Sequence, residues 1–252
     1  MSCATGKGLA QVGLEHIRNK RVASNLAFPH ALESRGQATR DETMTQTLLD
    51  TDERPATLSG IAKAIHECRR CPIGFLDNQA VPGAGLKKAA LMVVGEQPGD
   101  QEDLAGKPFV GPSGQLLDRY MVEAGIDRRQ VYVTNAVKHF KFVWRGKRRL
   151  HQSPTSGEID VCRFWLDGER AIVRPQLILA LGTSAARGVL GKAATISKAR
   201  GHPISLADGT EAWVTAHPSY LLRLKDEMKR EQERLFRADL AAVAERLAEL
   251  AG

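Results

Sequence analysis

The chain has 252 residues, of which 42% are hydrophobic, so it can fill the core of one large domain or two small ones, and wholesale disorder is excluded. It carries 36 Lys and Arg against 29 Asp and Glu, a formal net charge of +7. Basic and acidic residues balance within residues 1–55, so the whole excess lies in residues 56–252. A basic globular domain favours a polyanionic partner such as nucleic acid.

The hydropathy pattern and the cysteine content argue against a membrane or disulfide-rich secreted protein. Apolar runs reach about four to eight residues, far below the ~20 of a membrane-spanning helix. No apolar stretch typical of a secretory signal is present near residue 1. Four cysteines are too few for a disulfide scaffold in a chain of this length. We therefore expect a cytoplasmic protein with reduced thiols.

Residues 1–55 show no clear hydrophobic period apart from one short helical pattern near residues 9–21. We expect this segment to be a flexible N-terminal extension or the remnant of a fused module. The pattern changes at residue 56, so we place a globular domain at residues 56–252.

Apolar runs and helical patterns alternate along this domain. The sequence predicts strands at 90–94, 131–134, 177–181 and 212–216, and helices at 56–68, 115–124, 184–190 and 225–250. Short strands that are apolar on both faces are typical of a parallel sheet covered by helices. The predicted class is therefore α/β, with a central, mostly parallel, four-stranded sheet.

Polar or turn-forming residues follow the predicted strands. They are Gly95 to Asp100, Asn135, Gly182 to Ser184, and His217 to Ser219. Ligands of such folds bind beyond the carboxyl ends of the strands, so these residues predict a site there. His217 suits hydrogen-bond donation to a developing anion, although a strand-end histidine is also a common structural cap.

Two glycine-rich loops follow the first predicted strand. The loop at 95–103 places four carboxylates within eight residues, which suits either acid–base chemistry or an exposed acidic turn. The loop at 106–114 surrounds Phe109 with glycine and proline. The phenyl ring is either a stacking platform for a base or an anchor in the core.

The stretch at 138–151, KHFKFVWRGKRRLH, holds six Lys and Arg, no acid, and three aromatic residues. Cations neutralise phosphates and aromatic rings stack on bases, so this composition favours nucleic acid over a merely solvated basic loop.

Cys68 and Cys71 have the spacing of a metal-chelating pair, which is also compatible with a redox pair or with chance. Cys162 could join them through the fold, and His139 is the candidate fourth ligand, since Cys3 lies in the extension. Composition does not separate zinc from an iron–sulfur cluster.

Five segments in this order resemble the uracil-DNA glycosylase superfamily: GEQPGDQED, KPFVGPSG, VTNAVKHFKF, GKRRLH and HPSYLLR. The resemblance spans about residues 58–245 and is greatest to the UdgX branch, which is related to the iron–sulfur family 4 enzymes. It implies a three-layer α/β/α fold that holds a flipped deoxyuridine at the strand ends. We therefore expect the partner to be uracil-containing DNA, with single strands favoured. We expect the protein to be a monomer and to be associated with the nucleoid when it is bound to DNA.

The resemblance also implies roles for individual residues. Phe109 resembles the ring that stacks on uracil, and Asn135 resembles the reader of its amide edge, whose donor and acceptor match an amide side chain. His217 resembles the donor to uracil O2. Further implied contacts to the base or the DNA are Gln97, Asp100, Ser219, Tyr220 and Arg223. Family 4 enzymes hold a [4Fe–4S] cluster, and the matching positions here are Cys68, Cys71, Cys162 and, in place of a cysteine, His139; zinc is the alternative.

The segment 146–151 resembles a loop of UdgX proteins whose histidine becomes covalently attached to DNA, which implies this role for His151. Glu96 is the candidate that orients its imidazole, and Lys147, Arg148 and Arg149 are candidates for phosphate contacts. Without the resemblance, the sequence favours a solvated loop residue at His151. We expect uracil excision with capture of the abasic C1′ atom. The alternatives are a glycosylase that turns over and releases free uracil, and a metal-bound nucleic-acid module without catalysis.

Overall fold

The computed structural model describes residues 53–251. The helical pattern predicted at residues 9–21 and Cys3 lie outside the described residues. The boundary that we place at residue 55 stays a prediction. Within the described range, no helix is both long enough and apolar enough to cross a membrane.

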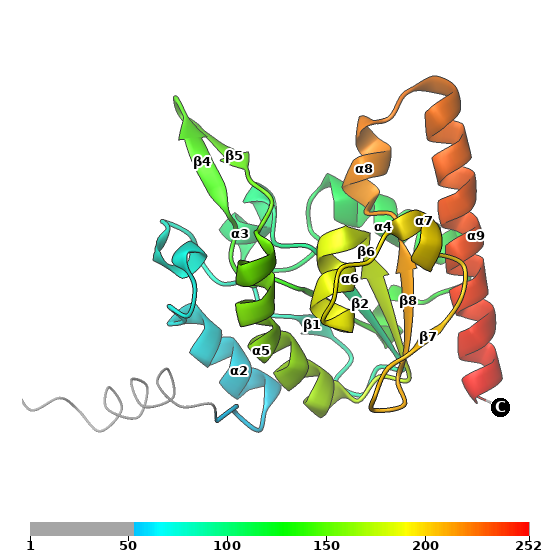
Figure 1. Cartoon of the computed structure of the whole chain (residues 1–252), viewed down its shortest axis with the longest axis horizontal. Coiled ribbons are helices and arrows are strands. Elements are labelled where there is room, and N and C mark those ends of the chain that lie inside the picture. Colours follow the sequence, from blue (N-terminus) through cyan, green and yellow to red (C-terminus); the bar gives the residue numbers. More distant parts are fainter. Residues whose placement is uncertain (1–52, 252) are drawn as a thin grey trace, which may run out of the picture. The chain divides into compact units, whose positions relative to one another are not determined.

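Figure 1 shows the order of the elements. The helices are α2 (Leu58–His66), η1 (Pro72–Phe75), α3 (Asp100–Ala105), α4 (Pro112–Glu123), η2 (Arg128–Gln130), α5 (Ser156–Val173), α6 (Gly182–Leu190), α7 (Ile196–Ala199), α8 (Pro218–Arg223) and α9 (Asp226–Ala251). The strands are β1 (Ala84–Gly85), β2 (Leu91–Gly95), β3 (Val131–Asn135), β4 (Phe142–Arg145), β5 (Arg148–His151), β6 (Leu177–Leu181), β7 (Ile204–Ser205) and β8 (Glu211–Thr215).

The main sheet has the strand order β1-β3-β2-β6-β8-β7. Its four central strands are parallel and are the four that the sequence predicts. The prediction of four strands is incomplete, because β1 and β7 add antiparallel pairs at the two edges. Each of these edge strands has two residues, which is too short for a hydrophobic period to reveal.

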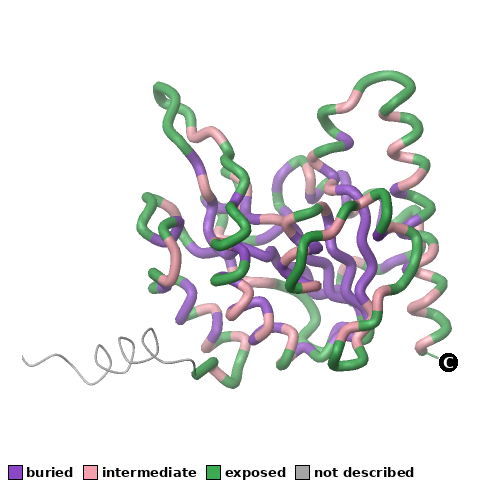
Figure 2. Tube along the Cα trace, viewed as in Figure 1, coloured by how far each residue is buried: buried purple, intermediate pink, exposed green. Residues whose placement is uncertain are grey.

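Helices cover both faces of the sheet, as the three-layer prediction expects. Leu91 and Val93 of β2 pack into one apolar cluster with residues of α4, α8 and α9. Met92 and Val94, which alternate with them, pack into a second cluster with residues of α2, α5 and α6. The four central strands are buried throughout apart from the start of β8, and Figure 2 shows them as the purple interior between the helices.

Helix α5 and the hairpin β4–β5 are among the elements that were not predicted from the sequence. Helix α5 begins at a capping box, in which Thr155 and Glu158 each bind the other's backbone N–H, and it runs for 18 residues. The hairpin β4–β5 forms its own two-stranded sheet, in which Phe142 lies opposite His151. It turns at Gly146, whose φ of +60° suits glycine at a tight hairpin turn.

Lys138 belongs to the basic stretch but does not reach solvent. Its Nζ atom lies 2.6 Å from Glu169 Oε2 and also donates to Thr134 Oγ1 and to the backbone carbonyl of Asn135. Both members of this ion pair are buried, and Glu169 also accepts from the Gly83 N–H and the Thr134 hydroxyl. The interpretation of Lys138 as part of a DNA-facing surface is therefore wrong, because its charge is neutralised inside the domain.

We predict that Glu169→Gln destabilises the fold by about 3–5 kcal/mol, because it leaves the Lys138 ammonium buried without a counter-charge. Urea unfolding of the variant and the wild type measures this loss. Glu123→Gln, at the exposed pair with Arg237, is the control and should cost less than about 1 kcal/mol. Adding Lys138→Met to Glu169→Gln should restore part of the stability, and no recovery would contradict the unpaired-charge explanation.

Candidate active site

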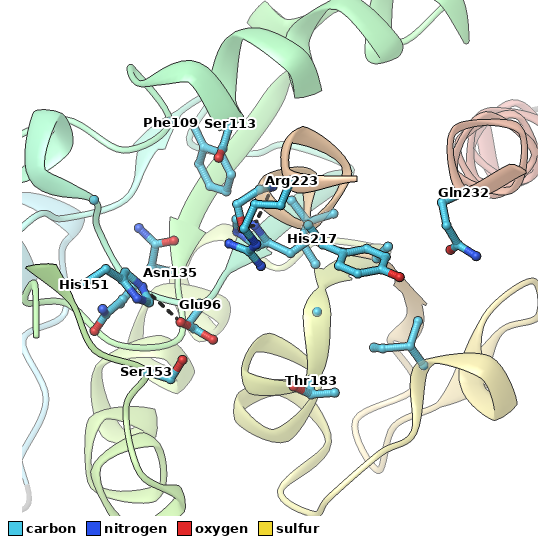
Figure 3. Close-up of a pocket in the computed structure, with 18 of the residues that line it drawn as sticks. Glu96, Phe109, Ser113, Asn135, His151, Ser153, Thr183, His217, Arg223 and Gln232 are labelled. Carbon is cyan, nitrogen blue, oxygen red and sulfur yellow. Dashed lines mark hydrogen bonds and ion pairs between the residues drawn. The ribbon is translucent and has the colours of Figure 1, made fainter. Parts of the chain in front are cut away.

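A cavity of about 1170 Å³ lies at the carboxyl ends of the parallel strands. Figure 3 shows residues from separate segments facing it, which belong to the ends of β2, β3 and β5, the loop before α4, and the start of α8. Of the predicted site residues, the lining includes Glu96, Gln97, Phe109, Asn135, His151, His217, Ser219 and Arg223, together with Tyr220. The topology thus brings together side chains that are up to 127 residues apart (Glu96 to Arg223).

Gly95 makes room for a ring and an amide at the floor of the cavity. A Cβ atom at this position would lie 2.4 Å from Asn135 Oδ1 and 2.7 Å from Phe109 Cζ. Phe109 itself has a φ of +59°, an uncommon conformation for a residue with a side chain. Strained backbone of this kind is concentrated at ligand sites, where surrounding structure maintains it.

Asn135 ends β3 with its side chain buried beside this ring. Its backbone carbonyl accepts from Lys138 Nζ, which fixes the strand end. Within residues 53–251, its side-chain amide has no hydrogen-bond partner. The amide therefore keeps one donor and one acceptor available for a ligand in the cavity.

Glu96, which lines the cavity, binds two side chains. Its Oε1 atom lies 3.2 Å from His151 Nε2, and its Oε2 atom accepts from the Ser184 hydroxyl at 2.6 Å (Figure 3 shows the first pair). Burial by itself would raise the pKa of Glu96, but the hydrogen bonds from His151 and Ser184 outweigh it and lower the pKa below its usual value. The carboxylate is therefore ionised beside an imidazole that is half exposed to the cavity.

Gln97 attaches the hairpin to the sheet. Its amide nitrogen donates to the carbonyls of Lys141 and Gln152, at 3.3 and 3.0 Å, and its amide oxygen accepts from the Lys141 N–H. These two residues flank the hairpin, one just before β4 and one just after β5. Together these three hydrogen bonds fix the hairpin and therefore the position of His151. They use both ends of the Gln97 amide, and a contact of Gln97 to the base stays a prediction.

Arg149 and Asp100 bind each other instead of facing the cavity. The Arg149 guanidinium lies 2.7 Å from Asp100 and 2.5 Å from Asp103, and it stacks over the rings of Phe140 and Phe142. Neither residue lines the cavity. In this structure Arg149 therefore ties the hairpin to α3; its predicted phosphate contact and the predicted base contact of Asp100 stay predictions.

The aromatic residues of the basic stretch divide into two groups. Phe140 and Phe142 are buried, so the interpretation of the aromatic rings in this stretch as stacking faces for bases does not apply to these two. Trp144 is 58% exposed. Lys147 and Arg148 are exposed, and among the described residues neither has an ion-pair partner.

His217 is held in one orientation at the start of α8. Its Nδ1 atom accepts the Ser219 N–H at 3.1 Å and lies 2.8 Å from the Ser219 hydroxyl. Because Nδ1 is an acceptor, the proton of the neutral ring resides on Nε2. Burial lowers the pKa of His217 to about 4, and Arg223 and His151 act in the same direction against Glu96. The site therefore holds a neutral imidazole that caps the helix and retains one free N–H donor.

The predicted metal ligands lie on three separated segments. Cys68 and Cys162 are buried, Cys71 is partly buried, and His139 is buried beside Ala80. N–H groups donate to the sulfurs: Trp165 Nε1 to Cys68, and the Lys138 backbone to Cys162. Burial raises the pKa of Cys162 to about 12; the charge and the backbone N–H of Lys138 oppose this increase, while Cys71 and Cys68 add to it.

In the described part of the chain, no three His, Cys, Asp or Glu side chains are grouped so as to hold a metal ion. The three cysteines and His139 nevertheless suit a metal group that is bound through thiolates. The N–H groups that donate to Cys68 and Cys162 would stabilise negative charge on these sulfurs. The cluster assignment stays a prediction.

Two residues that support the site were given no individual role by the sequence analysis. Glu102 accepts from the Gly99 N–H and the Gly111 N–H, at 3.0 and 2.9 Å, and so joins the two glycine-rich loops that carry Glu96 and Phe109. Ser184 orients Glu96 from α6. The cluster of carboxylates at 95–103 drew attention to the loop that contains Glu102. The position of Glu102 in the sequence did not indicate that it would bind the second loop.

The family model for the uracil DNA glycosylase superfamily matches residues 82–241. The chain therefore belongs to this superfamily. It is homologous to type-4 uracil-DNA glycosylases: the protein of that name from Thermotoga maritima is 36% identical over 172 residues, which cover 68% of this chain and 86% of that protein. The type-4 enzyme of Archaeoglobus fulgidus is 34% identical, covering 58% and 71%. A type-5 uracil-DNA glycosylase of Pyrobaculum aerophilum is 34% identical, covering 56% and 66%.

The depressed pKa of His217 makes stability depend on pH in a defined direction. The unfolded ring binds a proton below about pH 6.5, whereas the folded ring does so only below about 4. Its contribution to stability is therefore complete above pH 6.5 and is lost as the pH falls through 4. We predict that the free energy of unfolding of His217→Asn, which keeps a capping side chain, falls less steeply than that of wild type over this range. His202→Asn, at an exposed histidine, is the control, and parallel curves for His217→Asn and wild type would contradict the assignment.

Proposed function

We propose that this protein recognises uracil in DNA, breaks its N-glycosidic bond, and captures the abasic deoxyribose on His151. The observation that carries the proposal is the cavity in which a buried phenyl ring, an unpartnered amide, a neutral imidazole and a carboxylate-bound imidazole converge. Membership of the uracil DNA glycosylase superfamily supports the first two steps. The UdgX-like loop at 146–151 supports the third.

Base recognition follows from Asn135 and Phe109. The free amide of Asn135 pairs with the N3–H and O4 groups of uracil, while cytosine presents the reverse pattern. A site built to hydrogen-bond one pattern rejects the other because its buried polar groups remain unpaired. The Phe109 ring supplies the face on which a flipped base stacks.

Bond cleavage places negative charge on uracil and positive charge on the sugar. The C1′–N1 bond breaks with its electron pair leaving on uracil N1, and the free Nε2–H donor of His217 stabilises that anion through uracil O2. A neutral imidazole with a pKa of about 4 donates a hydrogen bond without requiring a protonation step. The sugar becomes an oxocarbenium-like electrophile, which the Glu96 carboxylate stabilises electrostatically.

Capture uses the imidazole that Glu96 orients. Since His151 Nε2 binds Glu96 in this arrangement, the lone pair lies on Nδ1. That lone pair forms the bond to C1′, and the ring becomes a cation whose Nε2–H is hydrogen-bonded to the carboxylate. A nucleophile held by the fold outcompetes solvent through proximity. Imidazole is a poor leaving group from this carbon, so the reaction stops after one turnover.

We predict that incubation with a uracil-containing single strand gives a protein–DNA band that survives boiling in detergent. His151→Ala should abolish this band while leaving DNA binding unchanged, because it removes the nucleophile and no phosphate contact. His202→Ala, at an exposed histidine outside the cavity, is the matched control and should give the wild-type band. Glu96→Gln should slow adduct formation about a hundredfold or more.

Two outcomes of this experiment select the alternatives. Free uracil in molar excess over the protein, without a stable band, would identify a glycosylase that turns over. DNA binding with no release of uracil at stoichiometric protein would identify a non-catalytic module.

We further propose that Cys68, Cys71, Cys162 and His139 hold a [4Fe–4S] cluster with a structural role. The curated relatives named type-4 glycosylases and the N–H donors to the sulfurs support it. Such a group would tie together the segments before η1, after β3 and within α5. Uracil excision itself transfers no electron.

Purified protein should be brown and contain about four iron atoms and four sulfides per chain. Cys162→Ala should lose the iron and the visible absorbance, whereas Cys3→Ser should keep both. A colourless protein that contains stoichiometric zinc would show that the cluster assignment is wrong.

A further inference from the structure

A second hollow, of about 800 Å³, lies between the hairpin β4–β5 and helix α3. Trp144, Lys147 and Arg148 of the hairpin line it, together with Leu104 at the end of α3. Trp144 is 58% exposed and Leu104 is 70% exposed. None of the steps proposed above uses either apolar side chain.

The hollow continues the face of the hairpin that carries His151. Trp144 lies opposite Arg149 in the hairpin, two residues along from the pair of Phe142 and His151. Residues two apart on a strand share a face, so Trp144 and His151 lie on the same side of the hairpin. Arg149, on the same face, also lines the hollow and forms an ion pair with Asp100 of α3.

The Trp144 ring rests on a buried support. Its centroid lies 5.5 Å from that of Phe142 at an interplanar angle of 88°, and Phe142 itself packs against Phe140. The Phe142 ring is buried, so this contact holds one side of the indole in place. Trp144 as a whole residue is nevertheless exposed, so it remains accessible to a ligand.

The available cations of the hollow lie at its hairpin end. Three carboxylates and three cations line the hollow, so its formal charges cancel, but Asp100 and Asp103 both bind Arg149 on the α3 side. Lys147 and Arg148 have no ion-pair partner in residues 53–251. A flat aromatic face beside two available cations suits a nucleotide, whose base stacks while its phosphate is neutralised.

We propose that Trp144 stacks on an unpaired base one or two nucleotides away from the nucleotide in the cavity, with Lys147 and Arg148 on the adjoining phosphates. Trp144 is offset from His151 by two residues along the hairpin, which is about 6.6 Å in the strand direction, and stacked nucleotides rise about 3.4 Å each. Bases in a duplex have both faces covered by their neighbours, so this contact selects single-stranded DNA. The inference rests on the proposed action on uracil-containing DNA and names the strand form that it takes.

Tryptophan fluorescence tests the contact directly, since the other two tryptophans, Trp165 and Trp213, are buried. The probe is a single-stranded oligonucleotide of thymidine and cytidine, which contains no uracil and therefore reports binding without excision. Titration of the wild type should give saturable quenching. Trp144→Ala should lose the quenching and bind about tenfold more weakly, Trp144→Phe should lose the quenching but bind within about threefold of wild type, and Val143→Ala should behave as wild type.

Equal binding of the oligonucleotide by Trp144→Ala and wild type, or quenching that persists in that variant, would overturn the inference. An equal loss of affinity for duplex and single strand would also overturn it, since the contact would then not be with an unpaired base. Quenching by a protein that fails to excise uracil would support the stacking contact and count against the proposed function alone.

Discussion

The site depends on the way in which one amide attaches the hairpin to the sheet. Gln97 follows Glu96 directly at the end of β2, and its side chain makes three hydrogen bonds with the backbone on either side of β4–β5. The same strand end therefore supplies both the carboxylate and the attachment of the histidine that the carboxylate binds. If the hairpin moved, Gln97 would lose all three hydrogen bonds at once. This cost holds His151 near Glu96 even without a ligand.

Around this attachment, the site separates two histidines by environment. His217 is buried and neutral, and its helix-capping bond leaves one donor directed away from the backbone. His151 is half exposed and bound to an ionised carboxylate. One ring is thus suited to stabilise a departing anion and the other to accept positive charge, which are the two demands of glycosidic cleavage followed by capture.

Most of the sheet could be predicted from the sequence because its central strands are buried on both faces and read as uninterrupted apolar runs. The strand ends likewise identified Asn135 and His217.

Helix α5 was missed although its capping box and its apolar positions at Ile159, Cys162 and Leu166 were readable. The hairpin was missed because its charged residues obscure a period of two. The burial of Lys138 and the ion pairs of Arg149 were not predicted, because a sequence shows a cation but not the carboxylate that pairs with it.

The central claim is that His151 itself bonds to the abasic carbon, and peptide mapping of the DNA-linked protein tests it most directly. After nuclease and trypsin digestion, the peptide of residues 150–163 should carry the added mass of an abasic deoxyribose phosphate, with fragment ions that locate it on His151. Attachment at another residue, or an unmodified peptide in a sample from which uracil has been released, would contradict the account.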